Sequence, residues 1–204
     1  MALPLHILKA ARWPGGVIIV VLIVYLQPTL HTALIYDRQA ILDGEVWRLV
    51  TGHWVHFSAN QLFWDGMVFG VTTYFIELRK YRYLPQLYLL SSVVSSLLML
   101  GLLPEMAYYG GLSGIAMATT AYLALQGLYE STPWHKLSVI TLILVILKLS
   151  IEIINDQFKW VDYMNDAIRT VPLSHISGAG CAWIVYIWSN RQYKGKRGLE
   201  SFVL

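Results

Sequence analysis

Repeated apolar segments, each about as long as a membrane-spanning helix, constrain the fold of this chain more than any other sequence feature. A helix needs about 20 consecutive, mostly apolar residues to cross a bilayer. We identify six such segments, at roughly residues 15–35, 60–77, 83–103, 112–129, 137–154 and 171–189. The sequence therefore predicts an all-α membrane protein, with six transmembrane helices in a single domain over residues 1–204.

The composition excludes most other classes of protein. Charged residues make up 13% of the chain and hydrophobic residues 56%, so a soluble fold would expose large apolar patches. The net charge of +3 comes without a basic stripe among aromatic residues, and we expect no nucleic acid as a partner. The single cysteine, Cys181, excludes an internal disulfide and a cysteine-based metal cage. We expect no cofactor.

The distribution of basic residues predicts the orientation in the membrane. With six spans, both termini lie on one side, and Lys and Arg favour the cytoplasmic side. Ten basic residues fall on the side of the termini and four on the other, namely Arg38, Arg48, Lys159 and Arg169. We therefore expect both termini in the cytoplasm and the long loop over residues 32–59 on the outer side, which would be the periplasmic side if the membrane is a bacterial inner membrane.

A serine flanked by glycines begins the fourth segment, in the run Gly110-Gly111-Leu112-Ser113-Gly114. Glycines allow a tight turn and let another chain approach the hydroxyl. The first turn of a helix also has free backbone N–H groups that could stabilise an oxyanion. The same motif is typical of a surface where membrane helices pack closely, so this run alone leaves both interpretations open.

A histidine stands at the corresponding end of the sixth segment. The fourth and sixth segments cross in the same direction, so Ser113 and His175 are expected at similar depth. A neutral histidine there could accept the serine proton as a general base. Gly178 and Ala182 are four residues apart, which predicts close contact with another helix. The alternative is a histidine that binds a backbone carbonyl or interfacial water.

Polar residues also gather at the start of the second segment. Gln61 and Asp65 lie four residues apart and share one helix face. His53 and His56 precede them in what reads as a loop without a third strong ligand, so we expect no metal. These histidines, with Ser58 and Asn60, could instead line a water-filled cavity that opens outward.

The fifth segment carries Lys148 and Glu152, an i, i+4 pair inside an apolar run. Mutual neutralisation is the simplest role for two opposite charges in a membrane. Lys before Glu is the less favourable order on a helix, and this favours a further partner on another helix.

Together these features resemble the rhomboid intramembrane serine proteases. The resemblance is carried by Trp47-Arg48 in the long loop, Gly111-Leu112-Ser113-Gly114 at the start of the fourth segment, and His175 with Gly178 in the sixth. It implies a six-helix rhomboid-like bundle and a serine endopeptidase in the lipid bilayer. This enzyme would hydrolyse a peptide bond in or near the transmembrane segment of single-span membrane proteins, with its active site open to the periplasm.

The resemblance also implies roles for individual residues. Ser113 would be the nucleophile and His175 its base, a dyad without the carboxylate of soluble triads. Gln61, the Ser113 backbone N–H and, as a further candidate, Asp65 would receive the oxyanion. Many rhomboids have a histidine and an asparagine at positions 61 and 65, and a tyrosine where this chain has Met117. Supporting positions are Gly111, Gly114, Met117, His56 and Gly178.

Two further interpretations and one subfamily remain open. The departures at Gln61 and Asp65 fit an inactive rhomboid relative that binds client helices. Asp65, Lys148 and Glu152 could instead form the proton path of a small transporter. Within the rhomboids, the pair Lys148 and Glu152 looks like the rhombosortase branch, whose substrates carry a C-terminal Gly-Gly motif before a membrane helix.

Overall fold

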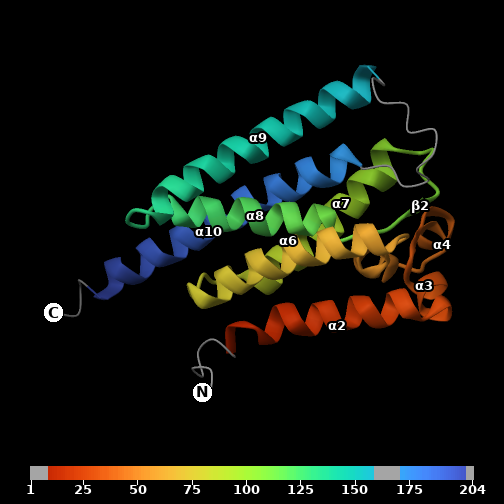
Figure 1. The fold of residues 1–204 in the computed structure, drawn as a ribbon, viewed down its shortest axis with the longest axis horizontal. Coiled ribbons are helices and arrows are strands. Elements are labelled where there is room, and N and C mark those ends of the chain that lie inside the picture. Colours follow the sequence, from red (N-terminus) through yellow and green to blue (C-terminus); the bar gives the residue numbers. More distant parts are fainter. Residues whose placement is uncertain (1–8, 159–170, 201–204) are drawn as a thin grey trace.

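The structure is a computed structural model that describes residues 9–158 and 171–200 as a bundle of helices (Figure 1). Its elements are α2 (Arg12–Leu26), α3 (Pro28–Leu34), β1 (Tyr36–Asp37), α4 (Arg38–Leu42), α5 (Arg48–Thr51), η1 (Gly52–Trp54), α6 (Ala59–Leu78), α7 (Leu84–Leu102), β2 (Tyr108–Tyr109), α8 (Ser113–Gly127), α9 (Trp134–Phe158) and α10 (Pro172–Glu200). The predicted class, a mostly helical membrane protein, agrees with this architecture.

The long helices run between two ends of the bundle. The helix α2 begins and α10 ends at one end, whereas α3, α4 and β2 lie at the other (Figure 1). The short strands β1 and β2 pair antiparallel, with Tyr36 opposite Tyr109. This pairing ties the segment after α3 to the segment that leads into α8.

The helix α8 lies at the centre and contacts α6, α7, α9 and α10. Its sequence is rich in Ala, Gly and Thr, so neighbouring helices can approach closely. Ala118, Ala121 and Tyr122 are buried against Cys181 and Ala182 of α10. Cys181 is therefore a packing residue in the core.

The backbones of α8 and α10 approach closely near the beginnings of both helices. A Cβ atom added at Gly178 would overlap the carbonyl oxygen of Gly114, and one added at Gly114 would lie 2.9 Å from the carbonyl oxygen of Ser174. Only glycines allow two backbones to meet in this way. The predicted close contact at Gly178 and Ala182 is confirmed.

The first apolar segment differs from the prediction. A single span over residues 15–35 was expected, but the chain bends by 108° between α2 and α3. Gln27 is extended, with φ −115° and ψ 99°, and Pro28 follows it. Proline lacks an N–H and disfavours helical backbone at the preceding residue, so α2 ends at Leu26.

The predicted number of six spans is not confirmed when each helix is tested for being long and apolar enough to cross a membrane. Among the described residues, only α7 and Trp134–Ile154 of α9 meet that test, and α2 with α3 would add a third if the bent pair is one span. The helix α8 has just 15 residues and ten of them are buried. A helix surrounded by other helices contacts protein rather than lipid, so it can be short and less apolar than a lipid-facing span.

The segment between α3 and α6 is organised by Arg48. Its guanidinium donates to the carbonyl oxygens of Thr32 and Ile35 at 3.0 and 2.8 Å, and its Nε donates to Glu45 at 2.6 Å. The side chain is almost completely buried. A buried guanidinium needs several acceptors, so Arg48 fixes the path of this loop around its own side chain.

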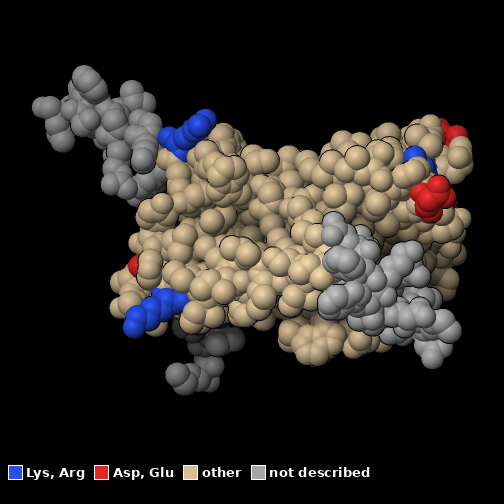
Figure 2. Space-filling model, turned by 90° about the horizontal axis from the view of Figure 1, so that it is seen from above, with Lys and Arg blue, Asp and Glu red and all other residues tan. Residues whose placement is uncertain are grey.

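The surface has the charge distribution of a membrane protein. Figure 2 shows Lys and Arg at the end where α2 begins and α10 ends, and mostly Asp and Glu at the opposite end. The described surface visible between them forms a wide band without either. Exposed apolar side chains on α9 include Ile140, Ile143, Leu144, Ile146 and Leu147. The chain is an integral membrane protein whose apolar band faces lipid.

The contact between α8 and α10 predicts a strong difference between two glycines of α10. Gly178→Ala forces the backbones apart and should lower the free energy of unfolding by about 1–3 kcal/mol. Gly180→Ala is the matched control, because a Cβ there would meet nothing within 4 Å. Thermal unfolding of both variants in detergent measures the difference, and equal melting temperatures would contradict the contact.

Candidate active site

Ser113 begins α8 directly after a glycine turn. Gly111 has φ +133°, a conformation that L side chains rarely adopt. Leu112 then enters helical backbone, and Ser113 is the first residue of α8. Ser113 is half-buried. The backbone N–H groups of this first turn have no acceptor within the helix, so they are free to bind a developing negative charge beside the hydroxyl.

The helix α6 places Gln61 and Asp65 against this turn. A Cβ atom at Gly111 would lie 2.5 Å from Nε2 of Gln61 and 3.1 Å from Oδ2 of Asp65. Gln61 Nε2 donates to the Gly110 carbonyl at 3.0 Å, and its Oε1 accepts from the Phe57 N–H at 3.0 Å. The Gln61 amide is therefore oriented, with its nitrogen toward the residues that precede Ser113.

His56 connects α6 to the same turn. Its Nε2 accepts from the Leu112 N–H at 3.3 Å and lies 3.3 Å from Oδ2 of Asp65, while its Nδ1 lies 3.3 Å from the Trp54 carbonyl. The imidazole is buried. His56 thus supports the turn before Ser113, and Asp65 lies beside His56, whereas Lys148 pairs with Glu152.

The sequence suggested that His53 could line a cavity that opens outward, but the structure places it in the core. Its ring is completely buried, with Nε2 3.1 Å from the Ser92 carbonyl and 3.2 Å from Ser96 Oγ. Burial lowers the pKa of His53 to about 4, so the ring is neutral near pH 7. The exposed fraction of His56 is 1%. Both histidines are structural parts of the loop because tertiary contacts cover them.

His175 lies in the first turns of α10 and faces α9. Its Nδ1 is 2.8 Å from Oε2 of Glu152, and the other oxygen of Glu152 is paired with Nζ of Lys148. Lys148 Nζ is also 3.3 Å from His175 Nδ1. The predicted partner of the Lys148 and Glu152 pair on another helix is therefore His175. Asp65 therefore belongs to a group around His56, and Lys148 and Glu152 belong to a separate group around His175.

Ser113 and His175 lie on the two helices that meet at Gly114 and Gly178. The residue after Ser113 contacts the backbone of Ser174, which precedes His175. Within the part of the chain that the structure describes, no hydrogen bond joins the Ser113 and His175 side chains. Catalytic hydrogen bonds are often long in enzymes without substrate and shorten in the reacting complex.

Tyr109 is a neighbour of the site to which the sequence analysis gave no role. Its ring is buried, and its phenol donates to the Gly111 carbonyl at 3.5 Å. Burial raises the pKa of Tyr109 to about 12, so the phenol stays protonated at neutral pH. Tyr109 immediately precedes the glycine run, but only the pairing of β1 with β2 shows that it turns inward. Met117, one turn after Ser113, is also buried.

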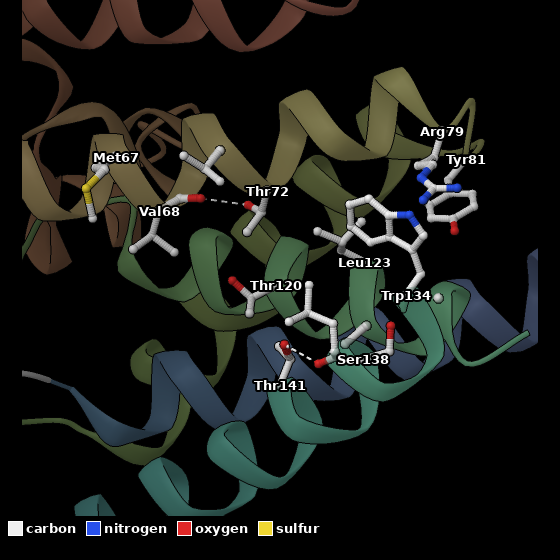
Figure 3. Close-up of a pocket in the computed structure, with 14 residues that line it drawn as sticks. Met67, Val68, Thr72, Arg79, Tyr81, Thr120, Leu123, Trp134, Ser138 and Thr141 are labelled. Atoms are coloured by element: carbon white, nitrogen blue, oxygen red, sulfur yellow. Dashed lines mark hydrogen bonds between the residues drawn. The ribbon is translucent and has the colours of Figure 1, made fainter. Parts of the chain in front are cut away.

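A separate cavity of about 310 Å³ opens between α6, α8 and α9 (Figure 3). Met67, Val68 and Thr72 line it from α6, Thr120 and Leu123 from α8, and Ser138 and Thr141 from α9. Arg79, Tyr81 and Trp134 close the end away from Ser113, where the Arg79 guanidinium lies 4.0 Å from the centre of the Trp134 ring. The lining is mostly apolar, which suits a hydrocarbon ligand or a helix side chain.

Comparison with known proteins identifies the family. A model of the Rhomboid domain matches residues 43–192, which is most of the chain. The chain belongs to the rhomboid family. No curated protein gives a significant match. Rhomboid proteases act on transmembrane substrates within the membrane, so membership points to intramembrane proteolysis. The matched region includes the buried Arg48, the glycine turn before Ser113, and His175 of this rhomboid protein.

The fit between α6 and the glycine turn can be tested with two glycines of similar backbone conformation. Gly111 and Gly44 both have positive φ, of +133° and +110°. A Cβ at Gly111 meets Gln61 and Asp65, whereas one at Gly44 meets nothing within 4 Å. We expect Gly111→Ala to destabilise the protein by about 1–3 kcal/mol more than Gly44→Ala, the usual cost of overpacking. Equal losses of stability for the two variants in thermal melts would show that the positive φ alone explains why position 111 is a glycine.

Proposed function

We propose that this rhomboid protein is an intramembrane serine endopeptidase that uses Ser113 as nucleophile and His175 as general base. The observation that carries the proposal is the contact of Gly114 with Ser174 and Gly178. This contact holds the first turns of α8 and α10 together, so the two residues with the required chemistry belong to adjacent turns.

The reaction follows from the chemistry of these groups. Nε2 of His175 accepts the Ser113 proton while Oγ attacks the carbonyl carbon of the scissile bond. The carbonyl oxygen becomes an oxyanion that the Gln61 amide and the Ser113 backbone N–H stabilise. The imidazolium then gives its proton to the leaving amine as the C–N bond breaks. Water, activated by His175, hydrolyses the acyl ester and restores Ser113.

The length of α8 supports a reaction below the membrane surface. Its 15 residues make a helix of about 22 Å, which is shorter than the roughly 30 Å hydrocarbon core of a bilayer. If the far end of α8 reaches the inner surface, Ser113 lies within the membrane. The termini then face the cytoplasm, in line with the basic residues at that end (Figure 2), and the site opens to the periplasm of a bacterial inner membrane.

The cavity between α6 and α9 gives a route for the substrate. Thr120 on its wall is seven residues after Ser113, which is about 10 Å along α8. A substrate helix that inserts between α6 and α9 would therefore bring its outer part to Ser113. The natural substrates are then single-span membrane proteins. By the resemblance of Lys148 and Glu152 to the rhombosortase branch, these proteins carry a C-terminal Gly-Gly motif before the membrane helix.

Covalent labelling tests the nucleophile and its base without a known substrate. A fluorophosphonate probe should label the detergent-solubilised protein at Ser113, and Ser113→Ala and His175→Ala should each abolish labelling because one reaction needs both groups. The double variant should be no worse than either single variant. Thermal melts check that the variants remain folded. An inactive relative would bind client helices without being labelled, and labelling that survives in Ser113→Ala would overturn the proposal.

The contacts of Gln61 and Asp65 lead to opposite expectations for two nearly isosteric changes. Gln61→Glu keeps the acceptor for the Phe57 N–H but replaces the amide donor by an oxygen, so labelling should slow by about 10²–10³-fold, the effect of losing one oxyanion donor. Asp65→Asn keeps the size of the side chain beside His56 and removes only its charge, so labelling should stay near that of the wild type. Severe loss of stability in Asp65→Asn would show instead that the carboxylate charge is essential.

A further inference from the structure

Glu152 is the carboxylate beside His175, and the sequence analysis gave it no catalytic role. Glu152 lies on α9, and its Oε2 is 2.8 Å from Nδ1 of His175. Both side chains are largely covered, with exposed fractions of 13% for Glu152 and 4% for His175. This is the distance of a charge-assisted hydrogen bond, formed between residues 23 positions apart on different helices.

The contact determines which nitrogen of His175 can act as a base. A carboxylate only accepts hydrogen bonds, so Nδ1 must carry the proton that points to Glu152. Nε2 then has a free lone pair, which is the form that a general base requires. Without a fixed acceptor at Nδ1, the ring would divide its time between two tautomers and several orientations.

Lys148 makes this arrangement compatible with the membrane. Its Nζ pairs with Oε1, the carboxylate oxygen that does not face His175. An isolated carboxylate in an apolar environment is costly, and the lysine compensates for its charge. The Lys148 side chain is 48% exposed, so the cation lies at the edge of the bundle while the carboxylate lies inside it. Lys148 and Glu152 together present one fixed, negatively charged acceptor to the imidazole.

We infer that Glu152 is a positioning residue for the proposed reaction: it holds the Nδ1–H of His175 so that Nε2 serves Ser113, and its charge stabilises the imidazolium that forms. The site would then combine serine, histidine and glutamate from α8, α10 and α9 rather than a dyad. This inference rests on the proposed protease function and adds to it the source of the active tautomer.

A purely structural role for Glu152 is the main alternative. The same contact ties α9 to α10, and loss of that tie would loosen the bundle. The two roles differ in what they change. A structural tie affects stability and the binding of a probe, whereas a positioning residue affects the rate of the covalent step at unchanged binding.

Phosphonylation of Ser113 by the fluorophosphonate probe separates these quantities. In this step the bond from Ser113 Oγ to phosphorus forms, the P–F bond breaks, fluoride leaves, and the serine proton passes to Nε2 of His175. The maximal labelling rate, kinact, reports the covalent step, and KI reports probe binding. Both are measured on the full chain in detergent for the wild type and each variant.

Glu152→Gln keeps the size of the side chain but removes its charge, and we expect kinact to fall by about 10²-fold or more with KI unchanged. Glu152→Asp keeps the charge and should recover part of the rate. The double variant Lys148→Met with Glu152→Gln removes both charges, so it reveals whether an unpaired lysine causes the loss. We expect this double variant to stay as slow as Glu152→Gln.

Glu130→Gln is the matched control. Glu130 also forms an ion pair, with Arg79 at 3.2 Å, and accepts from Tyr81 at 2.7 Å, but at the end of the bundle away from Ser113. Its kinact should equal that of the wild type. The inference is overturned if Glu152→Gln labels at the wild-type rate, or if the double variant restores the rate. If wild-type Ser113 is not labelled at all, the proposed protease function fails first.

Discussion

The approach of two helix backbones at Gly114 and Gly178 is the constraint on which the rest of this site depends. Most helix pairs are separated by side chains that leave 8–10 Å between their axes. Here the carbonyl oxygen of Gly114 occupies the place of a side chain on α10. That contact fixes the relative depth of the first turns of α8 and α10, which carry Ser113 and His175. Every other part of the site is attached to one of these two turns.

The side chains that contact these two turns are polar, and each of them also contacts residues outside the site. Gln61 is held between Phe57 and Gly110, and His56 between Trp54 and Leu112. His175 is held by Glu152. In a bundle that excludes water, a polar side chain without partners is destabilising. The polar contacts therefore have only a few arrangements that satisfy them, and this rigidity is what a preorganised site requires.

Part of this arrangement could be predicted from the sequence, and the limits have physical causes. The apolar segments predict helices, and the spacing of Gly178 and Ala182 predicts close contact, because both depend on local periodicity. The bend at Pro28 was missed, although the residues that cause it are adjacent, because the apolar run continues through it. The contact of Glu152 with His175 depends on the rotation of α9 relative to α10, which is set by long-range packing. An i, i+4 pair indicates only that a partner is needed.

The position of α9 relates the cavity to the state of His175, the base of the proposed reaction. The part of α9 that lines the cavity includes Ser138 and Thr141, whereas Glu152 is eleven residues beyond Thr141, about 16 Å along the helix. Most apolar side chains of α9 between them are exposed. In the proposed reaction, a substrate helix that enters at the cavity would push on one end of α9, and the hydrogen bond of Glu152 with His175 holds the other end. The imidazole of His175 would then stay ordered while a substrate helix enters only if its contact with Glu152 persists. This gives a physical reason for placing a costly carboxylate on a helix with many exposed side chains.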